Sequence, residues 1–146
     1  MKKEATLRFY KPSSNSNISL PLFSARVKAG FPSPADDNIE GRLDLNELVV
    51  RHPAATFFVR VEGDSMAGAN IQDGDILVVD RAVKATSGKV VVAILNGEFT
   101  VKRIQIETTR VLLLPENPQF QPLEVTEEID FEIWGVVTYI IHKCSS

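Results

Sequence analysis

A single dipeptide, Asn96-Gly97, constrains the fold most, because it separates two runs of β-forming residues, "VVVAIL" and "EFTVKRIQI". A two-residue hairpin loop needs positive φ at both positions, and asparagine and glycine tolerate this best. The sequence therefore predicts a β-hairpin over residues 90–106 with these two residues as its loop. Three cross-strand pairs follow from that register: Leu95 with Glu98, Ala93 with Thr100, and Val91 with Lys102.

Four more short runs after residue 54 are rich in the β-branched and aromatic residues that favour strands. They are "TFFVRV" (56–61), "DILVVD" (75–80), "RVLLLP" (110–115) and "IWGVVTYIIH" (133–142). One segment, "LDLNELVVRHP", indicates a helix that Asp44 can cap, with Glu47 at the capping-box position and Pro53 at its end. We therefore expect a small, mostly β, largely antiparallel domain with little helix.

The first thirty residues differ from the rest of the chain. "KPSSNSNIS" (11–19) is polar and rich in turn formers, and the following segment carries Pro21, Pro32 and Pro34, which exclude a long helix and favour extended backbone. We expect residues 1–30 to be an extended, flexible arm and residues 31–146 to be the β-rich domain.

Charge is also divided along the chain. Residues 1–30 hold six Lys/Arg and one acidic residue (6 − 1 = +5), and residues 31–146 hold ten basic and eighteen acidic residues (10 − 18 = −8). A basic arm could bind nucleic acid or the acidic body itself, and six scattered charges are a weak nucleic-acid signal. No apolar run is long enough to span a membrane or to act as a secretory signal, and the single Cys144 cannot form an internal disulfide. These features favour the cytoplasm.

Lys102 lies on the predicted strand face that also carries Thr100 and Ile104. One interpretation is that its side chain extends to water from a half-exposed face. The other is that burial lowers the lysine pKa, so that a neutral amine can accept the proton of a serine hydroxyl. Ser65 in "EGDSM" is a candidate serine, although Gly-Asp-Ser is also common turn or capping sequence. A Ser-Lys pair would need neither histidine nor metal.

Four motifs together carry a family resemblance: "EGDSM" (62–66), "DGDILVVD" (73–80), "GEFTVKR" (97–103) and "WGVV" (134–137). They resemble the LexA-type self-cleaving Ser-Lys peptidases (peptidase S24), in particular the UmuD branch, which includes the plasmid-borne MucA proteins. The resemblance begins at "LPLFS" (20–24) and covers most of the chain. It implies a LexA-like catalytic fold, Ser65 as nucleophile and Lys102 as general base. The backbone N–H groups of Asp64 and Ser65 are the expected oxyanion donors.

The resemblance also implies a substrate inside the chain. Members cut one of their own Ala-Gly or Cys-Gly bonds ahead of the β domain, and "KAGFPSP" offers Ala29-Gly30. A small residue before the bond and a glycine after it permit close approach of the backbone. UmuD itself has Cys-Gly here, so this chain departs from it. Without an active dyad, Ala-Gly would be ordinary linker sequence.

Partners follow from the resemblance alone. It implies a homodimer whose self-cleavage is stimulated by the RecA–single-stranded DNA filament after DNA damage. The processed form would then serve a Y-family polymerase of the UmuC or MucB kind in error-prone translesion synthesis (SOS mutagenesis), with no cofactor. The alternative is a non-catalytic module that regulates a polymerase. A DNA-binding repressor is disfavoured, because thirty residues rich in Pro, Ser and Asn cannot form a helix-turn-helix domain, so no sequence-specific DNA binding is expected.

The remaining ionisable residues give weaker signals. Asp73, Asp75 and Asp80 could suggest a cation site, but "QDGD" is more typical of a turn before a strand, and no metal is expected. His52 is placed to interact with the last carbonyls of the predicted helix. His142 has no partner pattern, and Cys144 has no predicted role.

Overall fold

Two stretches that lie far apart in the sequence combine into the larger of the chain's two structural units. The computed structural model describes residues 6–12, 18–23, 39–63, 69–116, 119 and 121–144. Residues 1–12 and 52–146 form one unit, called here the sheet unit, and residues 13–51 form the second, the hairpin unit. Within the described ranges, no helix is both long and apolar enough to cross a membrane.

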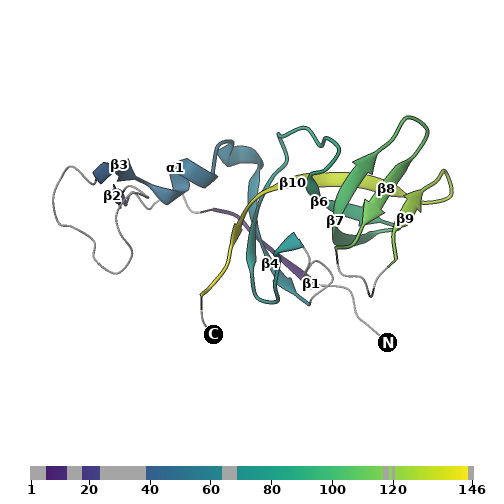
Figure 1. The fold of residues 1–146 in the computed structure, drawn as a ribbon, viewed down its shortest axis with the longest axis horizontal. Coiled ribbons are helices and arrows are strands. Elements are labelled where there is room, and N and C mark those ends of the chain that lie inside the picture. Colours follow the sequence, from purple (N-terminus) through teal and green to yellow (C-terminus); the bar gives the residue numbers. More distant parts are fainter. Residues whose placement is uncertain are drawn as a thin grey trace. The chain divides into compact units, whose positions relative to one another are not determined.

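An 8-stranded antiparallel sheet makes up most of the sheet unit (Figure 1). Its order is β1-β4-β5-β10-β6-β7-β8-β9, so β10 lies between two strands that precede it in sequence. The sheet is curled. Evidence for this is that the rings of Phe9 on β1 and Phe99 on β7 have centroids 4.7 Å apart, although β1 and β7 are not neighbours in the strand order. The predicted mostly β, antiparallel fold is confirmed. The strands are β1 Thr6–Tyr10, β4 Thr56–Glu62, β5 Ile76–Asp80, β6 Val90–Leu95, β7 Glu98–Ile106, β8 Val111–Leu114, β9 Leu123–Val125 and β10 Phe131–Ile141.

The hairpin of β6 and β7 has the predicted loop and register. Asn96 and Gly97 adopt φ of 48° and 85°, the positive values that a two-residue loop requires. The three predicted pairs are all present: Leu95 with Glu98, Ala93 with Thr100, and Val91 with Lys102. Just after β7, the hydrogen bond from Arg110 lowers the pKa of the half-buried Glu107 carboxyl. The hairpin thus fixes which side chains share a face with Lys102.

The predicted helix is present but shorter than expected. Helix α1 spans Leu45–Val49, and the Asp44 carboxylate caps it by accepting a hydrogen bond from the Asn46 N–H at 2.9 Å. The helix ends before Pro53, which instead begins the 3-10 turn η2, Pro53–Ala55. The expectation that Pro53 ends the helix is therefore wrong, because the chain leaves helical geometry already at Val50.

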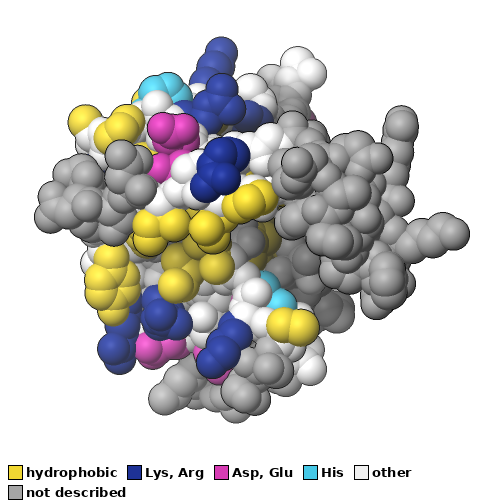
Figure 2. Space-filling model, turned by 90° about the vertical axis from the view of Figure 1, so that its left-hand side faces the viewer, with side chains coloured by type: hydrophobic (Ala, Val, Ile, Leu, Met, Phe, Trp, Pro, Cys, Tyr) yellow, Lys and Arg dark blue, Asp and Glu magenta, His cyan; other side chains and the backbone are white. Residues whose placement is uncertain are grey.

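The hairpin unit contains a second pair of strands. Strand β2, Leu20–Phe23, pairs antiparallel with β3, Ile39–Leu43, so the extended backbone expected around Pro21 is confirmed there. Residues 24–38 lie outside the described ranges, and the arm boundary at residue 30 stays a prediction. Leu20 and Leu45 of this unit are 61% and 65% exposed. Figure 2 shows one face of the molecule, on which hydrophobic side chains lie at the surface beside lysine and arginine side chains.

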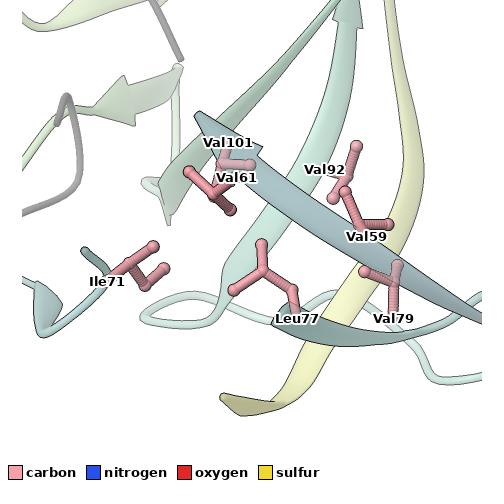
Figure 3. Close-up of a cluster of buried hydrophobic side chains, with 7 residues drawn as sticks. All are labelled: Val59, Val61, Ile71, Leu77, Val79, Val92 and Val101. Atoms are coloured by element: carbon pink, nitrogen blue, oxygen red, sulfur yellow. The ribbon is translucent and has the colours of Figure 1, made fainter. Parts of the chain in front are cut away.

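The core of the sheet unit consists of two clusters on the two faces of β6 and β7. Successive side chains of a strand point to opposite faces, so Val92 and Val101 enter the first cluster while Val91 and Ala93 enter the second. Figure 3 shows the first cluster closing over β4 and β5. Its members are Val59, Val61, Ile71, Leu77, Val79, Val92 and Val101. Those of the second are Val91, Ala93, Ile104, Leu113 and Val136.

Candidate active site

Lys102 lies inside the sheet unit. It occupies the middle of β7 opposite Val91, and only 6% of its surface is exposed. Its strand face is the one that carries Ala93 and Ile104 of the second core cluster. The interpretation in which the side chain extends to water is therefore wrong. A lysine enclosed by aliphatic side chains at a fixed strand position is a candidate for chemistry rather than for solubility.

A threonine on the same strand face holds the lysine amine. Lys102 Nζ donates to Thr100 Oγ1 at 2.8 Å and to the Val101 carbonyl oxygen at 3.2 Å. Both acceptors are neutral, and the hydroxyl fixes the direction of the amine. Sequence reasoning placed Thr100 on this face but gave it no role. Its position two residues before the lysine in a strand was the signal that could have identified it.

Four predicted site residues lie outside the described ranges. They are Ser65, its neighbour Asp64, and the two residues of the proposed cleavage bond, Ala29 and Gly30. Their roles stay predictions. The structure does describe the chain on both sides of residues 64–68, and thereby shows how that segment is anchored.

Both flanks of the segment 64–68 are fixed to the sheet unit. On one side β4 ends, and Gly63 adopts φ of 120° while its N–H donates to Asp73 Oδ1 at 3.0 Å. On the other side Ile71 is buried in the first core cluster together with Val61. Positive φ of this size suits glycine, so the backbone conformation at Gly63, just after β4, depends on the absence of a side chain there.

The acidic residues serve turns and histidine contacts. Asp73 accepts from Gly63, and Asp75 accepts from the Gln72 N–H at 2.8 Å within a turn in which Gly74 has φ of 89°. The structure thus supports the turn interpretation of "QDGD". The described part of the chain contains no group of three or more metal-ligating side chains.

Both histidines contact buried aspartates, which the sequence did not indicate. His142 Nδ1 lies 2.6 Å from Asp75 Oδ1, and His52 Nδ1 lies 2.6 Å from Asp80 Oδ2. The expectations that His52 interacts with the end of the helix and that His142 lacks a partner are therefore wrong. These pairs join residues 28 and 67 positions apart, so only the sheet topology brings them together.

The sequence matches one peptidase family over most of its length. The Peptidase S24-like family model matches residues 21–138. The chain belongs to the peptidase S24-like family. The matched region contains Lys102 and the segment 64–68, whereas β1 lies before it. Family membership and the buried lysine thus point to the same part of the molecule.

Curated relatives of this S24-like chain are similar over nearly their whole lengths. Protein SamA of Salmonella typhimurium (strain LT2) is 52% identical over 126 residues, which cover 86% of this chain and 87% of SamA. Protein ImpA of Salmonella typhimurium is 47% identical over 133 residues, 90% of each chain. Protein MucA of Escherichia coli is 47% identical over 122 residues, 83% of each chain. The expected resemblance to the UmuD and MucA branch is confirmed.

Proposed function

We propose that this protein is a serine endopeptidase that cuts its own Ala29-Gly30 bond, with Ser65 as nucleophile and Lys102 as general base. The observation that carries the proposal is the burial of Lys102 on β7, inside the region that matches the S24-like family. A lysine with 6% exposure, held by a neutral hydroxyl, has the enclosed setting that a Ser-Lys dyad needs.

The proposed reaction balances without a cofactor. The neutral Lys102 amine takes the Ser65 proton while Oγ attacks the Ala29 carbonyl carbon, and the N–H groups of Asp64 and Ser65 donate to the oxyanion. The C–N bond then breaks, and the Lys102 ammonium gives its proton to the leaving Gly30 nitrogen. Water, deprotonated in turn by the amine, hydrolyses the ester and frees Ser65. In this scheme Thr100 is a positioning residue, because its hydroxyl holds the amine.

The dyad requires the Ser65 hydroxyl to reach the face of β7 that carries Lys102. The roles of the two residues can be tested with the variants Ser65→Ala and Lys102→Ala. Each variant is incubated once at alkaline pH and once with RecA filament. The unmodified chain should give a fragment that begins at Gly30. Mass spectrometry should detect no such fragment from either variant. Unchanged fragment formation in either variant would contradict the dyad and favour the non-catalytic regulatory module.

The biological setting is proposed from the same membership. We infer that the RecA–single-stranded DNA filament promotes cleavage and that the processed chain, as a homodimer, assists a Y-family polymerase of the UmuC or MucB kind. Similarity to MucA and ImpA supports this inference, and exposed hydrophobic side chains such as Leu20 and Leu45 offer surface for assembly. Co-purification of the polymerase with processed but not with intact chain is the expected result. Cytoplasmic localisation stays a prediction.

A further inference from the structure

In the sequence, strand β1 precedes the proposed cleavage bond, whereas the other strands of the sheet unit follow it. It forms the outer edge of the sheet and, among the described strands, pairs with β4 alone (Figure 1). The antiparallel register places Thr6 opposite Glu62, Arg8 opposite Arg60, and Tyr10 opposite Phe58. A cut after Ala29 would therefore separate an intact edge strand from the sheet that it completes.

The inward side of β1 fills an aromatic slot. Leu7 and Phe9 are half-buried against the first core cluster. The Phe9 ring lies 4.7 Å from the Phe99 ring and 4.8 Å from the Trp134 ring, centroid to centroid, and meets Trp134 edge to face. These distances are typical of favourable aromatic pairs. Phe9 of β1 thus packs against Phe99 of β7 and Trp134 of β10.

The outward side and the end of β1 are held by polar contacts. Arg8 Nε pairs with Glu62 Oε1 at 2.9 Å, which offsets the like charge of Arg60 opposite. Lys11 Nζ donates to the carbonyl oxygens of Pro53 and Ala54 at 3.3 and 3.0 Å and lies 4.3 Å from the centre of the Phe57 ring. In the intact chain, the outer edge of β4 thus binds a segment in which Phe9 is preceded by Arg8 and followed by Lys11.

The covalent link keeps this short strand in place. β1 has 5 residues, and a tethered segment binds at an effective concentration of the order of millimolar. Once the chain is cut, the same contacts must act between separate molecules, and so small an interface is weak. Loss of β1 would leave a row of unpaired N–H and C=O groups on β4, which readily accepts another strand.

We propose that the outer edge of β4, with the slot formed by Phe99 and Trp134, is a binding site for an extended basic-aromatic segment of a partner protein. Residues 6–11 fill this site in the intact chain, and the opening of the site rests on the cleavage proposed above. The occupant is fixed by the contacts of β1: backbone pairing to β4, one aromatic ring in the slot, and cations for Glu62 and for the η2 carbonyls.

The test separates this site from self-cleavage. The full chain carries Ser65→Ala and a recognition sequence for an added protease between Ala29 and Gly30, so that it is cut whether or not the dyad exists. The probe is a fluorescent peptide of residues 4–12, "EATLRFYKP". After the cut and removal of the leader, fluorescence anisotropy should show binding of the peptide, while the uncut chain should show none.

Two controls make the result specific. A peptide with Phe9→Ala should bind at least about tenfold more weakly, because it loses the ring that packs against Phe99 and Trp134. A chain with Arg8→Cys, Arg60→Cys and Cys144→Ser places two thiols at directly paired positions. When the two thiols are oxidised to a disulfide, the cut chain should keep its leader and should not bind the peptide. Reduction of the disulfide should release the leader and restore binding of the peptide.

Four outcomes would overturn the proposal: a leader that stays fully bound to the cut chain at about 0.5 M sodium chloride without the disulfide, equal binding to cut and uncut chains, indifference to Phe9→Ala, or a cut chain that excludes the peptide because two copies pair along their β4 edges. The last outcome would assign the β4 edge to a second copy of this chain. Failure of the unmodified protein to cut itself would contradict the proposed function. It would not change the interpretation of these four outcomes, because an added protease makes the cut.

Discussion

At the scale of single residues, the contact between Thr100 and Lys102 carries the most chemistry. The hydroxyl accepts from the amine at 2.8 Å, and strand alternation puts both side chains on one face of β7. The lysine in "FTVKR" is visible in the sequence, but its burial follows from β10 and β8, which pack its neighbours into the second core cluster. Local spacing could therefore predict the face but not the enclosure.

Thr100→Val tests the positioning role of the threonine. Valine keeps the shape of the side chain but removes the acceptor, so the amine loses its orientation and self-cleavage should slow by about five- to thirtyfold, equivalent to roughly 1–2 kcal/mol. Thr100→Ser keeps the acceptor and is the matched control. Rates of fragment formation measured with and without RecA filament decide the outcome; a valine variant as fast as the serine variant would remove Thr100 from the mechanism.

The pH dependence tests Lys102 as the base. Only a neutral amine can accept the serine proton, so self-cleavage should be at least as fast at alkaline pH as at neutral pH. Circular dichroism at each pH checks that the chain remains folded. A rate that falls as pH rises, while circular dichroism shows an unchanged fold, would be incompatible with a lysine base.

At the scale of elements, local turn chemistry explains which strands could be predicted. The hairpin of β6 and β7 follows from Asn96-Gly97, two residues that readily adopt the positive φ that the loop requires. Strand β1 gave no signal, because it is short and pairs with β4 about fifty residues later. The histidine contacts likewise depend on distant pairing. The helix stop before Pro53 shows that a proline limits a helix without setting its end.

Gly135 in β10 is packed closely against Val79 of β5. A Cβ atom at this position would lie 2.6 Å from Val79 Cγ1 and 3.3 Å from Arg81 Cγ. Val79 is fully buried and cannot move aside, so Gly135→Ala should lower the free energy of unfolding by about 1–3 kcal/mol. Urea denaturation measures the change.

Gly41 provides the comparison for that experiment. A Cβ atom there meets nothing within 4 Å, so Gly41→Ala should be neutral or slightly stabilising, by up to about 1 kcal/mol. Equal stability of the two alanine variants would show that β10 and β5 can separate enough to admit a methyl group.

At the scale of the whole molecule, the proposed cut divides opposite charges. Residues 1–30 carry +5 (6 − 1) and residues 31–146 carry −8 (10 − 18). Attraction between exposed charges is screened by salt, so more leader should leave the cut chain as sodium chloride rises from about 0.05 M to about 0.5 M. Size-exclusion chromatography measures the leader that remains with the body. Retention that does not change with salt would assign the hold to the aromatic slot alone.

The place of β10 in the sheet has a consequence for synthesis on the ribosome. This strand, Phe131–Ile141, pairs with both β5 and β6, and no other strand in the described ranges does so. Ser65 follows β4 on one side of that junction, and Lys102 belongs to β7 on the other. A growing polypeptide that has not yet extended beyond residue 131 lacks the strand that pairs with both β5 and β6, so we expect the proposed self-cleavage to begin only after translation has passed this strand.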